Sequence, residues 1–499
     1  MNKKFLLGLD IGSSSVKASY IDAITGELIA SANSPETEMK IESSKSGWAE
    51  QHPETWWHHT VEAVKKITSK VNVSTFEVLG IGISYQMHGL VLVDADQKVL
   101  YPSIIWCDSR AVETGNKAFK ELGEEFCLEH FLNSPANFTA SKLRWVKENL
   151  PDIYSRTYKF MLPGDYIAMK LTGRITTTIS GLSEGIFWNF KNERIANEVL
   201  HYYKIHENLI PDIVPNFGDQ GVVNKKAADE LGLKHGIPVA YRAGDQPNNA
   251  LSLNVLNPGE IAATAGTSGV IYGVDNKNIF DPQNRVNTFA HVNYTKSKHN
   301  VGVLLCINGT GIQYSWIKQQ LFENKYSYNE MNTFASAVSP GSQGLMCFPF
   351  GNGAERVLTN KRIDAHFSGI DFNLHKKEHV INAAQEGIVF TFRYGLEVMK
   401  SMNMKFNVVR AGNSNLFQSP VFRKAFVNTC NVALELYNTD GSQGAARGAG
   451  IGTGLFSEVA AFKGLKLVEE LLPDPELVNQ YDSVYKKWEE ILRSKLNVN

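Results

Sequence analysis

The sequence predicts a two-domain α/β fold built by duplication, with a cleft between the domains. The first observation is length: 499 residues exceed what one hydrophobic core accommodates, so at least two domains are expected. The second is composition, because 43% hydrophobic and 20% charged residues are typical of a soluble globular protein. The third is a short Gly/Ser turn that occurs twice, at residues 10–16 and 264–270.

The two turns match at a constant offset of 254 residues. Each follows an apolar run and reads as strand, tight turn, strand; the offset places Gly12 on Gly266, Ser13 on Thr267, Ser14 on Ser268 and Val16 on Val270. Such a turn exposes backbone N–H groups and hydroxyls, a concavity suited to phosphate oxygens. One turn is weak evidence, but two at matching places indicate a nucleotide held between duplicated halves. The acid Asp10 has Thr264 as its counterpart, so the duplication is imperfect.

The first half is expected to form a strand meander followed by alternating elements. Pro53 and Glu54 favour a helix start, and the apolar residues after them approximate helical spacing. We expect strands at 5–9, 16–21, 27–32, 79–84, 90–93 and 239–242, and helices at 53–70, 110–122, 139–149 and 163–172. Residues 173–222 read as an insertion of loops and short helices.

The second half repeats this theme. We expect strands at 260–265, 269–274, 301–305 and 407–411, and helices at 310–323, 378–402, 418–436 and 475–495. The small residues of 444–452 do not fit a dinucleotide fingerprint and indicate a helix that another backbone approaches closely. We place the boundary near residue 255, giving an N-terminal domain over 1–255 and a C-terminal domain over 256–499.

Charge, cysteines and hydropathy exclude several classes of function. The formal net charge is −1 and no half carries a basic stripe, so nucleic acid is not expected as a partner. The five cysteines include no Cys-x-x-Cys pair, which indicates a reducing compartment. The N-terminus lacks signal-peptide anatomy, and Gln86 and His88 break the longest apolar stretch. We therefore expect a cytoplasmic protein with no membrane partner.

Two acids are candidates for chemistry. No Gly-Lys dipeptide occurs, which excludes a Walker-type loop and leaves phosphate binding to the two Gly/Ser turns. Asp10 beside the first turn suits Mg²⁺, directly or through waters, although an Asp also closes turns by itself; the repeated turn favours the metal. Asp245 follows a strand, and is either a helix N-cap or a general base that takes a proton from a substrate hydroxyl. The two roles are compatible.

A polar segment, Gln86-Met87-His88-Gly89, interrupts a strand pair. A lone histidine is more often structural than functional. Here Gln86 supplies polar groups and Trp106 a flat apolar face, a combination that suits a sugar, so a small polyol pocket is the functional reading.

The chain resembles the FGGY family of carbohydrate kinases over essentially its whole length. The family's first signature is nearly complete in Phe138–Asn149, with a departure at Asn137. The second runs from Ala365 to Glu386, with Gln385 where an apolar residue is usual. The resemblance implies the two-domain, actin-like, duplicated ribonuclease-H-like fold with ATP in the interdomain cleft, and a homodimer.

Within the family, residues 82–89, 48–51 and 105–108 are most similar to members that phosphorylate D-xylulose. This implies ATP-dependent phosphorylation of a ketopentose at O5, with Asp245 as the catalytic base. It also implies sugar contacts by Met87, His88 and Asp245, with Gln246 beside the sugar, and a role for Asp10 in placing the Mg²⁺-bound phosphate.

The same resemblance implies a set of nucleotide contacts. They are Ser13, Ser14 and Lys17 with Gly12 in the first phosphate loop, Thr267 with Gly266 and Ser268 in the second, Gly309 and Gln313 as further nucleotide contacts, and Gly412 and Asn415 in the loop under the adenine and ribose. Arg410-Ala411-Gly412 stands where three glycines are common. Gly244-Asp245-Gln246-Pro247 departs toward the form found in glycerol and gluconate kinases, which leaves the sugar open.

Three alternatives remain at this point. The first is another FGGY kinase, acting on ribulose, L-xylulose, gluconate or glycerol. The second is an actin-like or chaperone-like ATPase that serves as a binding module; such a protein has no use for the Gln86–Gly89 loop together with Asp245. The third is a nucleotide-binding protein without activity, which the presence of both acids disfavours.

Overall fold

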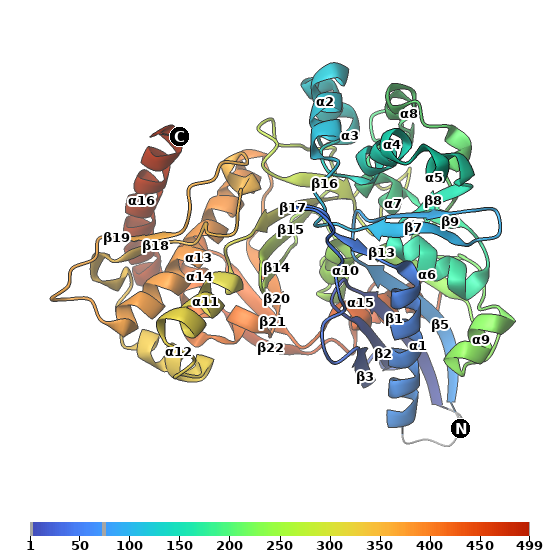
Figure 1. Ribbon diagram of the computed structural model, residues 1–499. Helices are drawn as coiled ribbons and strands as arrows, with labels where there is room; N and C mark the ends of the chain where they lie inside the picture. The colour runs from blue at the N-terminus through green and yellow to red at the C-terminus, as the bar shows by residue number, and fades with distance from the viewer. Residues whose placement is uncertain (1–2, 72–75, 499) are drawn as a thin grey trace.

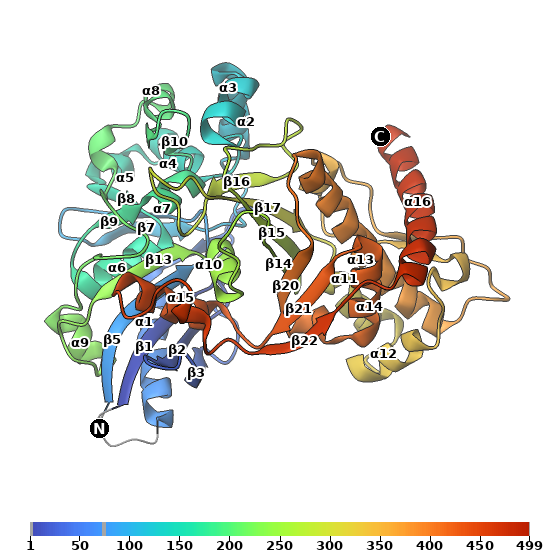
Figure 2. The same cartoon turned by 180° about the vertical axis from the view of Figure 1, so that it is seen from behind.

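The computed structural model describes residues 3–71 and 76–498, which form two lobes around two mixed β-sheets (Figures 1 and 2). The first sheet has the order β13-β5-β1-β2-β3. Its strands are β1 (Lys3–Ile11), β2 (Val16–Asp22), β3 (Leu28–Ser34), β5 (Phe76–Tyr85) and β13 (Val239–Gly244). β2 is antiparallel to both of its neighbours, β1 and β3, whereas β5 and β13 run parallel to β1.

The second sheet repeats this arrangement in its centre. Its order is β16-β17-β15-β14-β20-β21-β22, and its inner strands β14 (Ile261–Ala265), β15 (Gly269–Asp275), β17 (Val301–Ile307), β20 (Val408–Gly412) and β21 (Ala433–Tyr437) follow the same antiparallel and parallel pattern. The strands β16 (Asn287–Ala290) and β22 (Leu467–Leu471) are added at its edges. The predicted duplication is confirmed.

Helices and short strands cover these sheets. In the first lobe they are β4 (Glu50–Gln51), α1 (Pro53–Lys70), β6 (Leu90–Val93), β7 (Val99–Ile104), α2 (Val112–Leu122), α3 (Glu124–Phe131), α4 (Thr139–Asn149), α5 (Pro151–Arg156), β8 (Lys159–Met161), α6 (Pro163–Thr172), β9 (Thr176–Thr178), α7 (Ile179–Glu184), β10 (Trp188–Asn189), β11 (Arg194–Ile195), α8 (Asn197–Tyr203), β12 (Asp212–Val214), α9 (Lys225–Leu231) and α10 (Asp245–Ser252). In the rest of the chain they are α11 (Gly311–Trp316), which continues as a π-turn to Leu321, α12 (Tyr328–Ser336), β18 (Met346–Phe348), β19 (His366–Ser368), α13 (Lys377–Ser401), α14 (Pro420–Cys430), α15 (Gly441–Gly452) and α16 (Pro475–Val498).

One predicted helix is wrong in part. The expected helix over 418–436 ends at Cys430, where Asn431 adopts a left-handed conformation with φ of 50°. The chain then forms β21, in which Leu434 and Leu436 are buried and alternate with partly exposed residues. The alternation over five residues is the period of a strand, and the left-handed residue separates it from the helical period before it.

The two Gly/Ser turns join the first two strands of their sheets, but they differ in length. Ile11 pairs with Val16 across the first turn, whereas Ala265 pairs with Gly269 across the second. The second turn is therefore one residue shorter. The offset of 254 holds through Ser14 and Ser268, but the structural counterpart of Val16 is Gly269 rather than Val270.

The small-residue helix α15 covers one face of the first sheet, although it follows β21 of the second (Figure 2). A Cβ on Gly8 would overlap the carbonyl oxygen of Ser442, and one on Gly82 would overlap that of Ala445. Gly8 and Gly82 are paired neighbours on β1 and β5. The helix backbone thus lies directly on the sheet backbone, which confirms the close approach predicted for residues 444–452.

Among the residues that the structure describes, no helix is long and apolar enough to cross a membrane.

Replacing Gly82 by alanine should destabilise the protein, because the added Cβ meets a main-chain oxygen that cannot rotate away. We expect the free energy of unfolding to fall by about 2 kcal/mol or more, measured by urea denaturation. Gly412→Ala is the control, since a Cβ at Gly412 has its nearest neighbour at 3.4 Å, an ordinary contact. Equal stability of the two variants would contradict the close packing of α15.

Candidate functional site in the cleft

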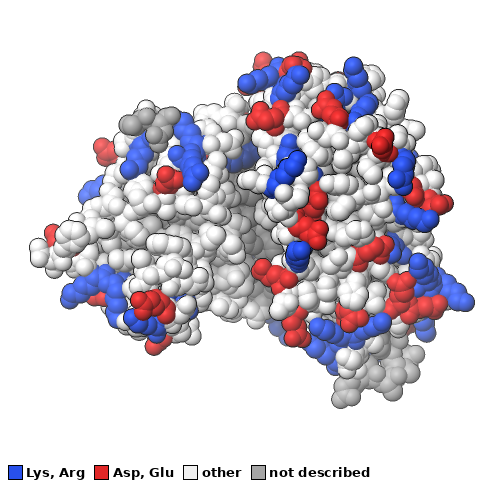
Figure 3. Space-filling view, viewed as in Figure 1, with Lys and Arg blue, Asp and Glu red and all other residues white. Residues whose placement is uncertain are grey.

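Figure 3 shows a hollow between the two lobes. Two carboxylates of the first lobe, Asp10 and Asp245, lie near enough for the charge of Asp10 to act on Asp245. Asp10 lies near the end of β1, and its Oδ1 accepts a hydrogen bond of 2.7 Å from Ser84 Oγ. A Cβ on Gly441, the first residue of α15, would overlap Asp10 Oδ2. Asp245 is the first residue of α10, and Gly244 before it is the N-cap. Asp245 is therefore not the N-cap itself, but its carboxylate accepts hydrogen bonds from Gln246, the next residue of the first turn.

The electrostatics of this pair favour a proton acceptor. Burial, and after it the charge of Asp10, raise the pKa of Asp245 to about 7, although hydrogen bonds from Gln246 lower it. Burial also raises the pKa of Asp10, with a further contribution from the charge of Asp440. A carboxylate with a pKa near neutrality takes up a proton readily at physiological pH.

The donor set at Asp10 fits a hard divalent cation. The neighbouring carboxylates of Asp10 and Asp245 repel each other, and carboxylate oxygens are ligands that Mg²⁺ accepts alongside phosphate oxygens and water.

Lys17, which the family resemblance assigns to the first phosphate loop, forms an ion pair of 2.8 Å with Asp440, the N-cap of α15. In this arrangement its charge is directed toward Asp440.

The first Gly/Ser turn is tied to the predicted sugar residues. Trp106 donates from Nε1 to Ser13 Oγ at 3.3 Å, and its ring is 53% exposed. Gln51 donates to the main-chain oxygen of Ser13 at 2.6 Å. The buried Gln86 donates in turn to Gln51 Oε1 at 3.5 Å. The structure therefore places the phosphate turn, Trp106 and Gln86 in one polar cluster.

His88 has a defined orientation and a defined charge. Its Nδ1 lies 3.1 Å from the main-chain oxygen of Glu184, and its ring packs against those of Phe138 and Phe289, with centroids 4.7 and 5.3 Å away. Burial lowers its pKa to about 3, so the ring is neutral. Because a carbonyl only accepts, Nδ1 carries the proton, and Nε2 is left as an acceptor. Met87 beside it is buried.

A cavity of about 450 Å³ lies beside the second Gly/Ser turn. Gly266, Thr267 and Asn415 line it, as predicted, and Gly412 ends the strand three residues before Asn415. Its other walls include Ile312, Tyr314, Tyr328, Asn329, Asn332, Leu416, Gln418 and Ser419. The rings of Tyr314 and Tyr328 are stacked at 5.6 Å. A cavity with aromatic and amide walls beside a phosphate turn suits a nucleoside.

Two of the predicted nucleotide contacts line a neighbouring cavity. Gly309 and Gln313 line a second cavity of about 460 Å³, together with Trp316 and Pro349. Gln313 Nε2 lies 3.1 Å from Cys347 Sγ. Ile312 borders both cavities, so one strip of α11 separates them. The structure does not bring Gly309 and Gln313 together with Thr267 and Asn415 in one cavity.

Two buried acids, Glu184 and Glu355, were not predicted from the sequence. Glu184 is 1% exposed, and its Oε2 lies 2.8 Å from where a Cβ on Gly244 would be, next to Asp245. Its pKa is well above the usual range, mainly because of burial. Glu355 accepts the N–H groups of Asn308 and Gly309, each at 3.0 Å. Each is an isolated acid in a loop or short helix, so no spacing distinguishes it in the sequence.

The chain is similar to known proteins along nearly its whole length. Residues 5–252 match the model of the N-terminal domain of the FGGY family of carbohydrate kinases, and residues 261–452 match that of its C-terminal domain. A xylulose kinase from Lactococcus lactis is 29% identical over 504 residues, which cover 98% of this chain and 97% of the relative.

Solved structures share the fold. The ligand-bound xylulose kinase from Lactobacillus acidophilus superposes with a TM-score of 0.88 at 22% identity, covering 98% of each chain. A gluconate kinase from the same organism gives a TM-score of 0.88 at 21% identity, covering 99% of each chain. The fold alone therefore does not distinguish these two sugars.

Replacing Asp10 by asparagine should lower the pKa of Asp245, because the variant loses the negative charge that disfavours ionisation of Asp245. The measurement is a pH titration of carboxyl ¹³C signals in aspartate-labelled protein, with Asp245→Asn to assign the signal. The exposed Asp229→Asn serves as control and should leave the titration in place. An Asp245 pKa that is the same with and without Asp10 would contradict the coupling.

Proposed function

Because the chain belongs to the FGGY family of carbohydrate kinases, we propose that it transfers the γ-phosphoryl group of ATP to O5 of D-xylulose, forming D-xylulose 5-phosphate and ADP. It is a sugar kinase rather than an actin-like or chaperone-like binding module. The observation that carries the choice of sugar is the Met87–His88 loop beside Asp245. The whole-length similarity to a protein named xylulose kinase supports the same choice.

Asp245 is the general base in this proposal. Its carboxylate takes the proton of the sugar hydroxyl while the hydroxyl oxygen forms a bond to the γ-phosphorus of ATP. The bond between that phosphorus and the bridging oxygen breaks, and its electron pair leaves with ADP. General-base assistance contributes about 10²–10⁴-fold to such reactions, and positioning and charge neutralisation supply the rest.

Neutral groups hold the sugar. His88 Nε2 accepts a hydrogen bond from a sugar hydroxyl, because its Nδ1 proton is committed to Glu184. Trp106 offers its exposed ring face to the C–H groups of the sugar, and Gln86 and Gln246 offer amides to further hydroxyls. A neutral, largely apolar pocket with few directed polar groups suits an uncharged polyol.

ATP occupies the cleft between the two turns. We place the nucleoside in the cavity lined by Thr267, Tyr314 and Asn415, with the phosphates directed to the N–H groups of both Gly/Ser turns. Asp10 would hold Mg²⁺, which neutralises phosphate charge when bound. Ser84 orients Asp10 for this role through its hydrogen bond.

A second sugar has a specific observation in its favour. Gln246 and Pro247 follow Asp245 in the form typical of glycerol and gluconate kinases, and the gluconate kinase structure superposes as well as the xylulose kinase structure. Gluconate carries a carboxylate, whereas the side chains proposed here to contact the sugar are neutral apart from Asp245, and the cations Lys142 and Arg356 act on His88 from nearby. The similarity to xylulose kinases over the whole chain is therefore what supports the choice of the ketopentose.

The proposal is tested by ADP release with ATP and Mg²⁺ against D-xylulose, L-xylulose, D-ribulose, L-ribulose, gluconate and glycerol. We expect kcat/KM for D-xylulose to exceed the others by about tenfold or more, equivalent to about 1.4 kcal/mol of transition-state discrimination. A preference for another sugar would overturn the substrate and leave the role of Asp245 in place.

Asp245→Asn should lower kcat by about 10²–10⁴-fold with a small change in the KM for either substrate, because the amide cannot accept the proton. The wild-type kcat/KM should fall as the pH drops below about 7, where Asp245 becomes protonated. Both are measured in the ADP-release assay, with Asp229→Asn as the matched control. A kcat within twofold of wild type would remove the general-base assignment.

A further inference from the structure

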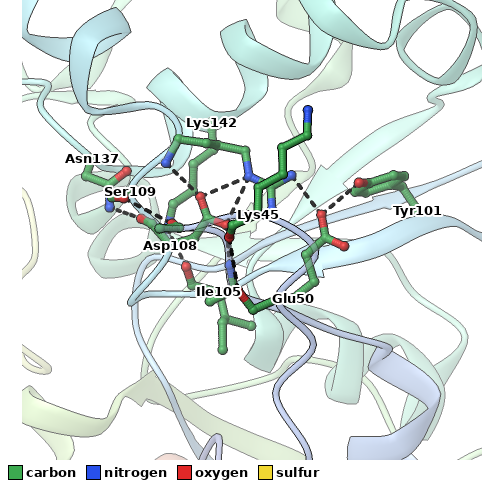
Figure 4. A network of polar contacts seen from close by, with 12 residues as sticks. Lys45, Glu50, Tyr101, Ile105, Asp108, Ser109, Asn137 and Lys142 are labelled. Atoms are coloured by element: carbon green, nitrogen blue, oxygen red, sulfur yellow. Dashed lines mark hydrogen bonds and ion pairs between the residues drawn. The ribbon is translucent and has the colours of Figure 1, made fainter.

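Lys142 is a fully buried cation on α4 that contacts two loops of the sugar pocket (Figure 4). Its Nζ donates to the main-chain oxygens of His88 and Ile105, each at 2.9 Å. His88 is itself a predicted sugar contact, and Ile105 directly precedes Trp106. One ammonium group therefore joins the loop between β5 and β6 to the loop that follows β7.

The His88 loop needs such support. His88 has a φ of 62°, in the left-handed region that residues other than glycine rarely adopt. A conformation of this kind costs about 1–3 kcal/mol and persists only where the surroundings determine it. The hydrogen bond from Lys142 fixes the His88 carbonyl, and the contact with Glu184 fixes its ring. Together they set the direction of Nε2.

The Trp106 loop is fixed at its other end by Asp108 (Figure 4). The buried Asp108 carboxylate accepts the Ala49 N–H at 2.6 Å and pairs with Arg110 at 2.7 Å. Arg110 continues to Glu50 at 2.7 Å, and Asn137 donates to the Asp108 main-chain oxygen. With Lys142 on Ile105, the loop is held on both sides of Trp106, and Lys142 links it directly to His88.

Packing alone does not explain a lysine at this position. Burial lowers the pKa of Lys142 to about 7, which shows that the site disfavours its charge. An apolar side chain of equal length would fill the space without that cost, but it would leave the His88 carbonyl without the donor that Lys142 supplies. A buried carbonyl without its donor costs about 1–3 kcal/mol.

We propose that Lys142 is a positioning residue for the sugar, which sets the spacing of the His88 and Trp106 loops so that both side chains face one bound sugar. The inference rests on the proposed function of this pocket. It assigns no contact between Lys142 and the sugar, and it predicts an effect on sugar binding that is separate from ATP binding.

The test is Lys142→Met, which keeps the length of the side chain and removes its donors. We expect the KM for D-xylulose to rise about tenfold or more, with the KM for ATP within twofold of wild type. The matched control is Lys147→Met on the same helix, where Lys147 is partly exposed and contacts the main chain of Lys204. An unchanged sugar KM, or equal increases in both KM values, would overturn the proposal.

A second variant covers the case in which Lys142→Met is too unstable to assay. Lys142→Ala is assayed with and without ethylammonium, which restores a donor in the space left by the side chain. A sugar KM that falls at least threefold on addition of the amine supports the proposal, and a KM that does not respond overturns it. If the wild-type protein prefers another sugar in the substrate panel, D-xylulose is wrong as the proposed substrate, and the KM comparison for Lys142 is made with the preferred sugar.

Discussion

The close approach of α15 to the first sheet is the constraint on which the site depends. Main-chain atoms of α15 touch those of β1 and β5, which only glycines at Gly8 and Gly82 permit. This contact brings residues from the last quarter of the chain onto the first sheet and sets Gly441 against Asp10. It also brings Asp440 to Lys17. The surroundings of Asp10 are therefore assembled from both ends of the chain.

Burial has the largest effect on the pKa values of the titratable side chains in the cleft. Asp245 has its pKa raised to about 7, His88 is kept neutral, and Lys142 is held among main-chain oxygens. A buried polar group is costly unless it has a partner, and here the partners are mostly main-chain groups. Each such bond fixes a loop as well as a charge. The same hydrogen bonds therefore hold these titratable side chains and the loops around them.

The proposed sugar pocket includes an element of the second sheet. Phe289, on the edge strand β16, packs against the rings of His88 and Phe138. Asn133 of the first lobe forms two hydrogen bonds with the main chain of Thr288, at 2.6 and 3.0 Å, as a neighbouring strand would. Ser183 bonds Ala290 at 3.0 Å. The sugar loop and the sheet that carries the second phosphate turn are thus in direct contact.

The sequence by itself determined the features that depend on neighbouring residues. The two Gly/Ser turns, most of the strands and helices around them, the small-residue helix, and Asp10 and Asp245 at strand ends follow from local pattern, because turn chemistry and periodicity act over a few residues. The sequence-based prediction was wrong at β21, because Asn431 in the left-handed conformation ends the helix and the alternating pattern of a strand follows it. Only the tertiary structure decided that the charge of Asp10 raises the pKa of Asp245. It also decided that Gln313 and Thr267 line different cavities, and that Lys142 donates to the carbonyl of His88, 54 positions away. These outcomes depend on burial and on contacts between distant segments, which local sequence does not encode.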